Sequence, residues 1–290
     1  MKKLSGLVGQ TPLIKISDRI FAKFEGQNPS GSIKDRMATY IINHAEQNGL
    51  IKRGDTIIEA TSGNSGIAFA FIAAERGYKC VIIMPKNMSE ERKQMLRLYG
   101  AELIEVEDGK FDDAIALRDK IAKERGWFNP NQFHNPLNIE AHEKGTGVEI
   151  LHQHTEKIAA FIDGTGTGGT LMGTTRLLKM YHSDMKVVAV EPAESPVMSG
   201  GQAGLHGIQG IGDGSKFLVN LDEVDHIEVI STEDAKWRAR RLAKEQGLFV
   251  GISSGANILA AERFLEKNSK LEGNIITILC DRGERYLSCL

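Results

Sequence analysis

Short β-rich runs alternate with helix-forming segments along most of this chain, and that alternation limits its possible folds more than any other feature. The predicted strands are rich in Ile, Val and Ala and span residues 56–60, 79–85, 101–107, 158–163, 186–192, 226–231, 248–253 and 274–280. Strands that are separated by helices form parallel sheets covered by helices on both faces. We therefore predict an α/β fold of mostly parallel, twisted sheets, and 290 residues suit two modest domains or one large domain.

Three of the predicted helices carry clear end signals. Ser89 precedes an apolar-periodic run that Gly100 ends. Residues 111–126 change from acidic to basic, which is the charge order that the helix dipole favours. Ser231 is followed three positions later by Asp234, a pairing similar to a capping box.

Two segments interrupt the alternation. Residues 129–145 are rich in Asn and Pro, which predicts a crossover between two halves of the molecule. Residues 193–219 are Gly-rich and show no clear periodicity. A loop of that length in a compact protein is usually functional or mobile, so the second segment is a candidate for either.

Charge and cysteine usage exclude several classes of protein. The formal net charge of −2 provides neither the basic stripe of a nucleic-acid-binding protein nor the polybasic face of a membrane-bound one. The odd set Cys80, Cys280 and Cys289 has no C-x-x-C spacing, which favours buried thiols in a reducing compartment over disulfides or zinc. His152 and His154 are only a weak metal signal, and we predict no metal. With no signal peptide and no run of membrane-spanning length, we expect a soluble cytoplasmic protein.

A turn rich in Gly and Thr follows the predicted strand at 158–163. In the sequence DGTGTGGT, residues 163–170, glycines let backbone N–H groups converge on an anion, and the N-terminus of the next helix favours negative charge. The turn also contains a G-x-G-x-x-G match, and Glu191 ends a strand about twenty residues further on. This is the fingerprint of a dinucleotide site, so a nicotinamide-dependent oxidoreductase is a serious candidate for the function of this chain. No Walker-type G-K-[ST] is present, which disfavours an NTPase.

Three further junctions between loops and helices are candidates for a site. The first, between a predicted strand and an apolar helix, consists of Thr61, Ser62, Gly63, Asn64 and Ser65. These hydroxyl, amide and N–H groups suit a carboxylate, although an ordinary helix cap explains them equally well. In the second, GISSGAN, Ser254 is better explained as an N-cap. In the third, NPSGSIKDR, Lys34 is either a first-turn surface lysine or the residue around which the site is organised.

These motifs occur in a fixed order, in which QGIGDG at 209–214 precedes GISSGAN and GERYLS closes the series. In this order the sequence resembles the cysteine synthases (O-acetylserine sulfhydrylases) and cystathionine β-synthases, which are pyridoxal-phosphate-dependent enzymes of fold type II. The resemblance covers essentially the whole chain, and several separated motifs are far more specific than any single one. It implies two domains similar to those of the tryptophan synthase β subunit. A smaller one at 28–138, with the extreme N-terminus, would bind the substrate carboxylate, and a larger one at 6–27 plus 139–290 would bind the cofactor phosphate.

The resemblance also implies roles for individual residues. Lys34 would link covalently to the aldehyde of pyridoxal 5′-phosphate. Asn64 would bind the phenolic oxygen of the cofactor, and Ser253 would face its pyridine nitrogen. The cradle for the cofactor phosphate would consist of Gly166, Thr167, Gly168, Gly169 and Thr170. The substrate would be bound by Thr61, Ser62, Gly63, Asn64, Ser65, Gln132 and Gly210.

The implied reaction is replacement of the β-substituent of an L-amino acid, in the parent case O-acetyl-L-serine plus sulfide giving L-cysteine and acetate. Lys34 would remove the α-proton of the substrate. A serine at the pyridine nitrogen does not hold a proton there as a carboxylate does, which favours β-elimination and β-replacement. Because Lys34, Asn64 and Ser253 are all present, a catalytically silent sensor of the same fold is disfavoured. Relatives are usually homodimers, and we expect the same here.

Two places depart from the pattern of the family. Asp213 stands where cysteine synthases commonly carry a small apolar residue, and a solvated loop acid is the slightly favoured explanation. As a catalytic residue, Asp213 would instead orient a water or bind the ammonium group of a second amino acid. That role would suit an enzyme that consumes cysteine and releases hydrogen sulfide, with water or a thiol as the nucleophile. In CDRGERYLS, Cys280 is expected to pack in the core, and Arg282 either reaches the cofactor or faces solvent.

Overall fold

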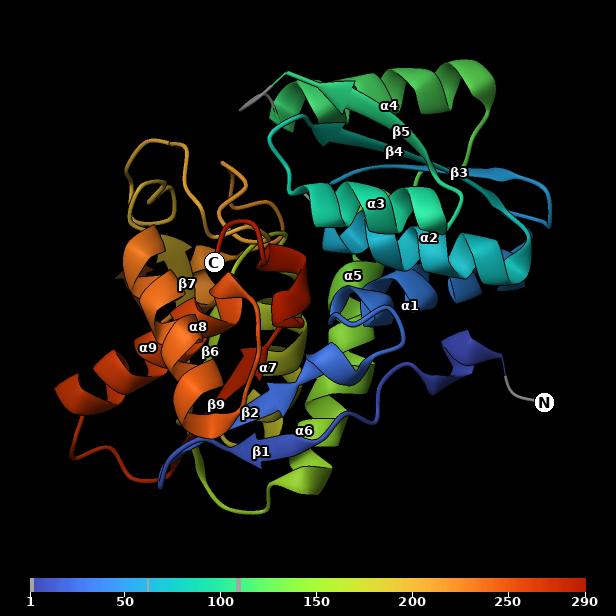
Figure 1. Ribbon diagram of the computed structural model, residues 1–290. Helices are drawn as coiled ribbons and strands as arrows, with labels where there is room; N and C mark the ends of the chain where they lie inside the picture. Colours follow the sequence, from blue (N-terminus) through green and yellow to red (C-terminus); the bar gives the residue numbers. More distant parts are fainter. Residues whose placement is uncertain (1–2, 62, 108–110) are drawn as a thin grey trace.

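The computed structural model describes residues 3–61, 63–107 and 111–290, and these contain two separate β-sheets (Figure 1). The larger sheet is formed by β1 (Leu13–Lys15), β2 (Ile20–Phe24), β6 (Ile158–Gly164), β7 (Lys186–Pro192), β8 (His226–Ile230) and β9 (Asn274–Leu279). The smaller sheet is formed by β3 (Thr56–Ala60), β4 (Lys79–Pro85) and β5 (Glu102–Val106). The strand orders are β1-β2-β9-β6-β7-β8 and β3-β4-β5. All neighbouring strands are parallel except β1 and β2, which confirms the predicted α/β class.

Successive residues of a strand point to opposite sides of its sheet, so a sheet with apolar residues at successive positions needs cover on both faces. Helices provide that cover for the smaller sheet. These helices are α1 (Lys34–Gln47), α2 (Asn64–Arg76), α3 (Glu90–Leu98) and α4 (Phe111–Arg125). Ile57 and Ile82 pack on one face among apolar side chains of α1, α2 and α3. Ile58 and Val81 pack on the other face against α4. In Figure 1, α4 accordingly lies above this sheet, and α2 and α3 lie below it.

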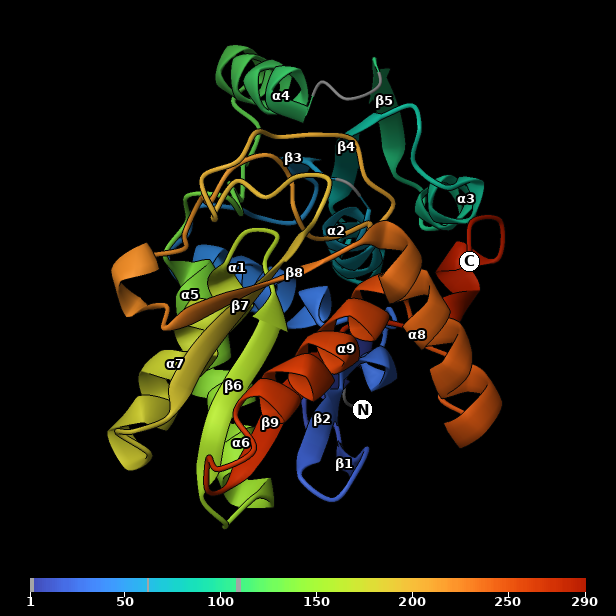
Figure 2. The same cartoon turned by 90° about the vertical axis from the view of Figure 1, so that its left-hand side faces the viewer.

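The larger sheet is covered in the same way. Its helices are α5 (Leu137–Ala141), the π-helix η3 (His142–Gly147), α6 (Val148–Gln153), α7 (Gly169–Tyr181), α8 (Thr232–Gln246) and α9 (Ile252–Lys267). Ile162 and Val188 face α8 and α9, which lie together on one side in Figure 2. Phe161 and Val187 face the opposite side, where α5, α6 and α7 pack. Short 3₁₀ turns complete the chain: η1 (Leu4–Leu7), η2 (Glu25–Gln27), η4 (Leu221–Glu223) and η5 (Gly283–Tyr286).

The predicted helices α3, α4 and α8 are confirmed, with boundaries close to those expected. At the start of α8, Ser231 Oγ accepts a hydrogen bond from the Asp234 N–H at 3.1 Å, as a capping box requires. The predicted strand at 248–253 is wrong, because Val250 forms only an isolated bridge and α9 already begins at Ile252. The segment 129–145 runs from the elements of the smaller sheet to those of the larger one, as predicted for a crossover, and it contains α5 and part of η3.

The loop predicted at 193–219 is confirmed as a segment without helix or strand. Within the described part of the chain, no helix is both long enough and apolar enough to cross a membrane.

The carboxyl ends of β3, β6 and β9 meet between the two sheets. Asn64, which follows β3, donates an Nδ2–H to Asp281 Oδ2 at 2.6 Å, and Asp281 follows β9. Ile33, just before α1, donates its N–H to the carbonyl of Cys280 at 2.9 Å. Loops at the carboxyl ends of parallel strands are the usual location of a ligand site, so this meeting point is where a site is expected.

Candidate active site

Two adjoining cavities lie where the carboxyl ends of β3, β6 and β9 meet. Lys34, Asn64 and Gly210 line both of them. The outer cavity is also lined by Thr61, Ser65, Gln132, Gly166, Thr167 and Asp213. The inner cavity is also lined by Asp163, Gly164, Thr170, Ser253 and Cys280. Most of the predicted site residues, which come from distant parts of the chain, are thereby brought together.

Lys34 is the first residue of α1 and is half-buried at the junction of the two cavities. The chain before it is held to the larger sheet by the Ile33 N–H, which bonds the Cys280 carbonyl. Asp35 holds the preceding loop in turn, since its carboxylate accepts a hydrogen bond from the Ser30 N–H at 2.6 Å. The backbone at Lys34 is therefore fixed from both sides.

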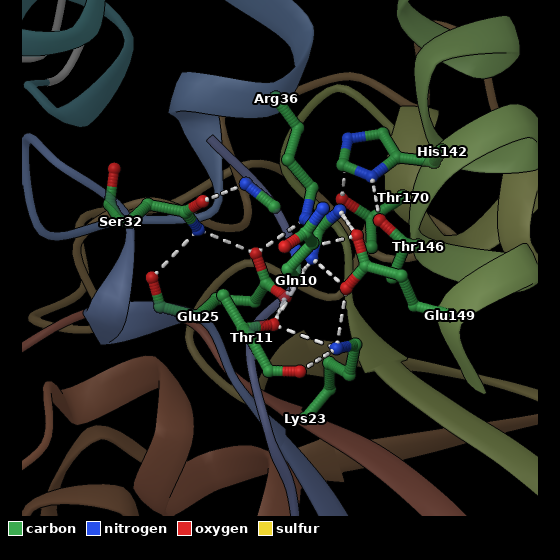
Figure 3. A network of polar contacts seen from close by, with 12 residues as sticks. Gln10, Thr11, Lys23, Glu25, Ser32, Arg36, His142, Thr146, Glu149 and Thr170 are labelled. Atoms are coloured by element: carbon green, nitrogen blue, oxygen red, sulfur yellow. Dashed lines mark hydrogen bonds and ion pairs between the residues drawn. The ribbon is translucent and has the colours of Figure 1, made fainter. Parts of the chain in front are cut away.

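A buried charge network anchors the same helix (Figure 3). Arg36 donates to both carboxylate oxygens of Glu25, at 2.6 and 2.8 Å, and to both oxygens of Glu149, at 2.7 and 2.8 Å. Lys23 adds an ion pair with Glu149 at 2.7 Å and donates to Thr11 Oγ1 at 2.8 Å. Although burial opposes it, hydrogen bonding to Arg36 lowers the pKa of Glu149 to about 2. The two positive charges of Lys23 and Arg36 thus balance the two negative charges of the glutamates beside the first turn of α1.

The turn at 164–170 forms the N-terminus of α7. Gly168 has a φ of +86°, and a Cβ there would lie 2.5 Å from Val219 Cγ2, so only glycine fits. Thr167 and Thr170 are buried beside it, and Thr167 Oγ1 accepts a hydrogen bond from Asn138 Nδ2 at 2.9 Å. Thr167 Oγ1 also accepts a long hydrogen bond, 3.4 Å, from the Gly169 N–H, but the N-cap residue of this helix, Gly168, carries no side chain that could cap it. Its first N–H groups and the two hydroxyls therefore suit an anion.

His142 of η3 supports this turn from one side (Figure 3). Its Nε2 lies 3.3 Å from Thr170 Oγ1, and its Nδ1 lies 2.9 Å from Thr146 Oγ1. Burial, aided by the positive charge of Arg36, holds the pKa of His142 well below its usual range. The imidazole is therefore neutral, which leaves anion binding to hydroxyl and N–H groups.

Replacing Gly169 by Ala is expected to weaken the binding of pyridoxal phosphate, the cofactor implied by the family resemblance, whose phosphate this turn would hold. A Cβ on Gly169 would overlap the side-chain oxygen of Asn138, the residue that donates to Thr167 Oγ1. Displacing a packed side chain costs about 1–3 kcal/mol, so the dissociation constant should rise about 10- to 100-fold. Equilibrium titration of the apoprotein with the cofactor measures this change. Gly6→Ala is the control, because a Cβ there meets nothing within 4 Å, and equal affinities of the two variants would contradict the prediction.

The turn at 61–65 is positioned by Gln132 at the start of α2. Ser65 Oγ donates to Gln132 Oε1 at 2.6 Å, and Thr61 Oγ1 accepts from the Gly63 N–H at 3.0 Å. Ser62 lies outside the described residues. Because Thr61, Ser65 and Gln132 all line the outer cavity, their polar groups converge where a carboxylate could be bound.

Asn64 connects the site to the segment that follows β9. Its Nδ2 and the Tyr286 hydroxyl both donate to Asp281 Oδ2 at 2.6 Å. Arg92 of α3 donates an Nη2–H to the Tyr286 hydroxyl at 2.7 Å, which extends the network across both sheets. Asn64 Oδ1 is buried and accepts no hydrogen bond from the described protein. A hydroxyl on a ligand would satisfy this oxygen.

An open groove of about 430 Å³ leads to the outer cavity, with which it shares Gly210 and Asp213. Asp213 is half-buried, and a Cβ on Gly166 would lie 3.4 Å from Asp213 Oδ2. The carboxylate therefore stands at the mouth of the site, close to the turn at 164–170. The sequence slightly favoured a solvated loop acid, whereas the structure places Asp213 in the loop but half-buried at the cavity.

Two other acidic or basic candidates have structural partners. Glu191, the acid of the dinucleotide fingerprint, accepts hydrogen bonds from the N–H groups of Met198 at 2.7 Å and Ser199 at 3.0 Å. It therefore holds the long loop, which leaves its carboxylate unsuited to binding a ribose. Arg282 is exposed and donates Nε–H to the Gly26 carbonyl at 2.7 Å, so its guanidinium is engaged away from the cavities.

Sequence reasoning missed several residues that form the site. Asp163 and Cys280 line the inner cavity, and Asp281 and Tyr286 orient Asn64. Their one local signal is position, since Asp163 is the last residue but one of β6, and Cys280 and Asp281 are the two residues after β9. Conversely, the predicted residues Gly63, Gly168 and Gly169 line neither cavity. They belong to the backbone of the turns whose other residues form the cavity walls.

The donor set of the two cavities fits pyridoxal phosphate. Lys34, Asn64 with its unsatisfied acceptor Oδ1, and residues of the turn at 164–170 line the two cavities, and Ser253 lines the inner one. The phosphate of that molecule would suit the turn at 164–170, its aldehyde would suit the Lys34 amine, and its phenolic hydroxyl would suit Asn64 Oδ1.

Known proteins share this combination of fold and sequence. The family described as pyridoxal-phosphate-dependent enzymes matches residues 4–281. A cysteine synthase of Staphylococcus aureus is 43% identical over 297 aligned residues, covering 98% of this chain and 95% of that protein. A hydrogen sulfide-producing enzyme of Fusobacterium nucleatum has a TM-score of 0.94 and 40% identity, covering 99% of this chain and 100% of that one. Cysteine synthase of Entamoeba histolytica has a TM-score of 0.93 and 38% identity, covering 100% of this chain and 90% of that one.

Proposed function

Because the chain belongs to the family of pyridoxal-phosphate-dependent enzymes, we propose that it makes L-cysteine and acetate from O-acetyl-L-serine and sulfide. The observation that carries this proposal is the convergence of Lys34, Asn64 and the turn at 164–170 on the same pair of cavities. The identity to the cysteine synthase of Staphylococcus aureus supports the choice of substrates.

In the proposed reaction, Lys34 performs two tasks through the same nitrogen. Its Nζ would hold the aldehyde of the cofactor and, when free, would accept the proton from the α-carbon of the bound amino acid. The bound cofactor supplies the electron sink for the charge left at that carbon. Asn64 and Ser253 orient the ring, and Thr167 and Thr170 bind the phosphate together with the N–H groups of α7.

The outer cavity holds the substrate in the same scheme. Thr61, Ser65 and Gln132, with Ser62, bind the carboxylate of the amino acid. Gly210 lines the same cavity, and the Gly63 N–H orients the Thr61 hydroxyl by donating to its Oγ1 at 3.0 Å. This capture fixes the α-proton near Lys34 Nζ and draws the smaller sheet and its helices closer, which excludes water from the reacting atoms.

Parallel assays test the proposal most directly. The purified protein with pyridoxal phosphate is supplied with O-acetylserine, phosphoserine, serine or cysteine, each with and without sulfide. We expect sulfide-dependent cysteine formation to be fastest with O-acetylserine. No turnover of any of the four would favour a silent sensor, and bound nicotinamide cofactor without a visible absorption band would favour an oxidoreductase.

A second function is favoured by Asp213. A carboxylate at the mouth of the outer cavity repels an incoming sulfide anion, whereas it would orient a water or attract the ammonium group of a second amino acid. The similar enzyme of Fusobacterium nucleatum produces hydrogen sulfide. The alternative is therefore consumption of L-cysteine with release of sulfide, forming serine, lanthionine or cystathionine.

Asp213→Asn is expected to lower sulfide release from L-cysteine by at least about 10²-fold, because water or a thiol would lose its base. Sulfide release is measured continuously for the wild type and the variant. Asp222→Asn, a change at an exposed acid further along the chain, should leave the rate unaltered. If the wild type releases no sulfide from cysteine, the alternative function is wrong, and biosynthesis remains.

We also propose a cytoplasmic homodimer with domains at 28–138 and at 6–27 plus 139–290. The three cysteines are unpaired thiols, as a reducing compartment favours. The apolar clusters around the smaller sheet draw only on residues of the first range, which supports the division. Light scattering tests the dimer, and a monomer mass would contradict it.

A further inference from the structure

Asp163 is a buried acid on the wall of the inner cavity that the proposed roles leave unused. It lies at the carboxyl end of β6, has 3% of its surface exposed, and lines the inner cavity together with Lys34 and Ser253. Acids this deeply buried are rare unless a partner balances them. Asn257 of α9 donates an Nδ2–H to Asp163 Oδ1 at 3.1 Å. A neutral amide alone does not balance a buried carboxylate.

Asn257 also fixes Asp163 relative to Ser253. Asn257 and Ser253 are four residues apart on α9, so they lie on the same face of that helix. Asn257 Oδ1 accepts from the Gly164 N–H at 2.8 Å, and its Nδ2 also donates to the Ile278 carbonyl at 2.9 Å. The amide is thus held by β6 and β9 at once, and it holds Asp163 on the wall that carries Ser253.

The positive charge of Lys34 does not fully offset the burial of the Asp163 carboxyl group. Burial raises the pKa of Asp163 to about 7, against the opposing positive charge of Lys34. Three other groups line the same cavity as Asp163. They are Lys34 at the start of α1, Cys280 just after β9, and Thr170 in the first turn of α7. Burial, with the charge of Asp163 adding to it, raises the pKa of Cys280 well above its usual range, so that thiol stays neutral. A proton donor placed in this cavity would stabilise the carboxylate.

We propose that Asp163, oriented by Asn257, keeps the pyridine nitrogen of bound pyridoxal phosphate protonated, a task that the Ser253 hydroxyl cannot perform. The inference rests on the proposed function, since it requires that cofactor with its ring nitrogen toward Ser253. The proton resides on the ring nitrogen and the negative charge on the Asp163 carboxylate. Such a charge-assisted pair offsets the cost of burying either ion.

This pair changes the expectation drawn from Ser253 alone. A protonated ring accepts more of the charge left at the α-carbon of the substrate, so Lys34 removes the α-proton more easily. The protein would therefore combine a fold used for β-replacement with a cofactor ring that accepts more charge than a ring whose nitrogen faces only a serine.

The ¹⁵N chemical shift of the ring nitrogen tests the proposal without reference to turnover. The holoenzyme is loaded with ¹⁵N-labelled pyridoxal phosphate and measured near neutral pH. We expect the shift of a protonated pyridinium in the wild type and loss of that shift, to the value of a neutral pyridine, in Asp163→Asn. Glu191→Gln is the matched control, because Glu191 is a buried acid at the end of the neighbouring β7 that binds backbone N–H groups, and it should keep the wild-type shift.

The experiment distinguishes failure of the role of Asp163 from failure of the proposed function. A neutral nitrogen in the cofactor-bound wild type overturns the role of Asp163 alone, whether or not the variants fold. A pyridinium that persists in folded, cofactor-bound Asp163→Asn overturns it as well. If the wild type retains no labelled cofactor, the proposed function itself is wrong and the inference ends with it.

Discussion

Lys34→Ala is expected to abolish covalent attachment of the cofactor and to lower turnover by about 10²–10⁴-fold, the range for removing a group that transfers a proton. The reason is that in the proposed reaction the Lys34 Nζ both holds the cofactor and accepts the α-proton, and Lys34 lines both cavities. Borohydride reduction followed by peptide mapping measures the attachment, and the visible absorption band of the bound cofactor should disappear in the same variant.

Lys15→Ala is the matched control for this experiment. Lys15 is an exposed lysine whose ion pair with Asp18 spans 3.3 Å, so its loss should leave both attachment and rate unchanged. Labelling of any other lysine in the wild type, or an unmodified Lys34 after reduction, would remove the basis for the proposed reaction.

Arg36→Met is expected to reduce the free energy of unfolding by about 3–5 kcal/mol, the usual cost of removing one partner of a buried ion pair. Glu25 is completely buried, and the variant would leave its carboxylate without the guanidinium that contacts both of its oxygens. The midpoint of denaturant unfolding should fall while the slope of the transition stays constant.

Arg241→Met provides the comparison, because Arg241 and Glu245 form an exposed pair one helical turn apart, and pairs of that kind contribute at most about 1 kcal/mol. The double variant Arg36→Met with Glu25→Gln should recover part of the loss by removing the buried charge. Equal midpoints for Arg36→Met and Arg241→Met would show that the network does not hold α1 in place.

The parallel sheets could be predicted because buried parallel strands are continuous apolar runs that the local sequence encodes. The strands at 56–60, 79–85 and 186–192 agree with the structure to the residue. β1 and β2 were not predicted, since they are short and β2 depends on pairing with β9 from the far end of the chain. The strand expected at 248–253 failed because packing of α9 on the larger sheet outweighs the local preference of its first residues.

The turns at 61–65 and 164–170 could be singled out by one rule, that polar turns at the carboxyl ends of parallel strands meet, whereas Gln132 and the residue roles came from the family resemblance. That rule applied equally to Asp163 and Asp281, but a single acid at a strand end belongs to no recognisable motif. The bond between Asn64 and Asp281 joins residues 217 positions apart, and no local pattern encodes such a contact. Motifs therefore predicted which turns matter, whereas the polar groups that orient them required the fold.

The position of β9 sets the order in which this protein can be completed on the ribosome. β9 lies inside the larger sheet between β2 and β6, yet it follows every other described strand in the chain. Until it emerges, β2 and β6 expose unpaired edges, which are prone to wrong partners. Cys280 and Asp281 are also still missing from the nascent chain at that stage. Cofactor loading therefore awaits the segment that carries β9 and the two residues after it.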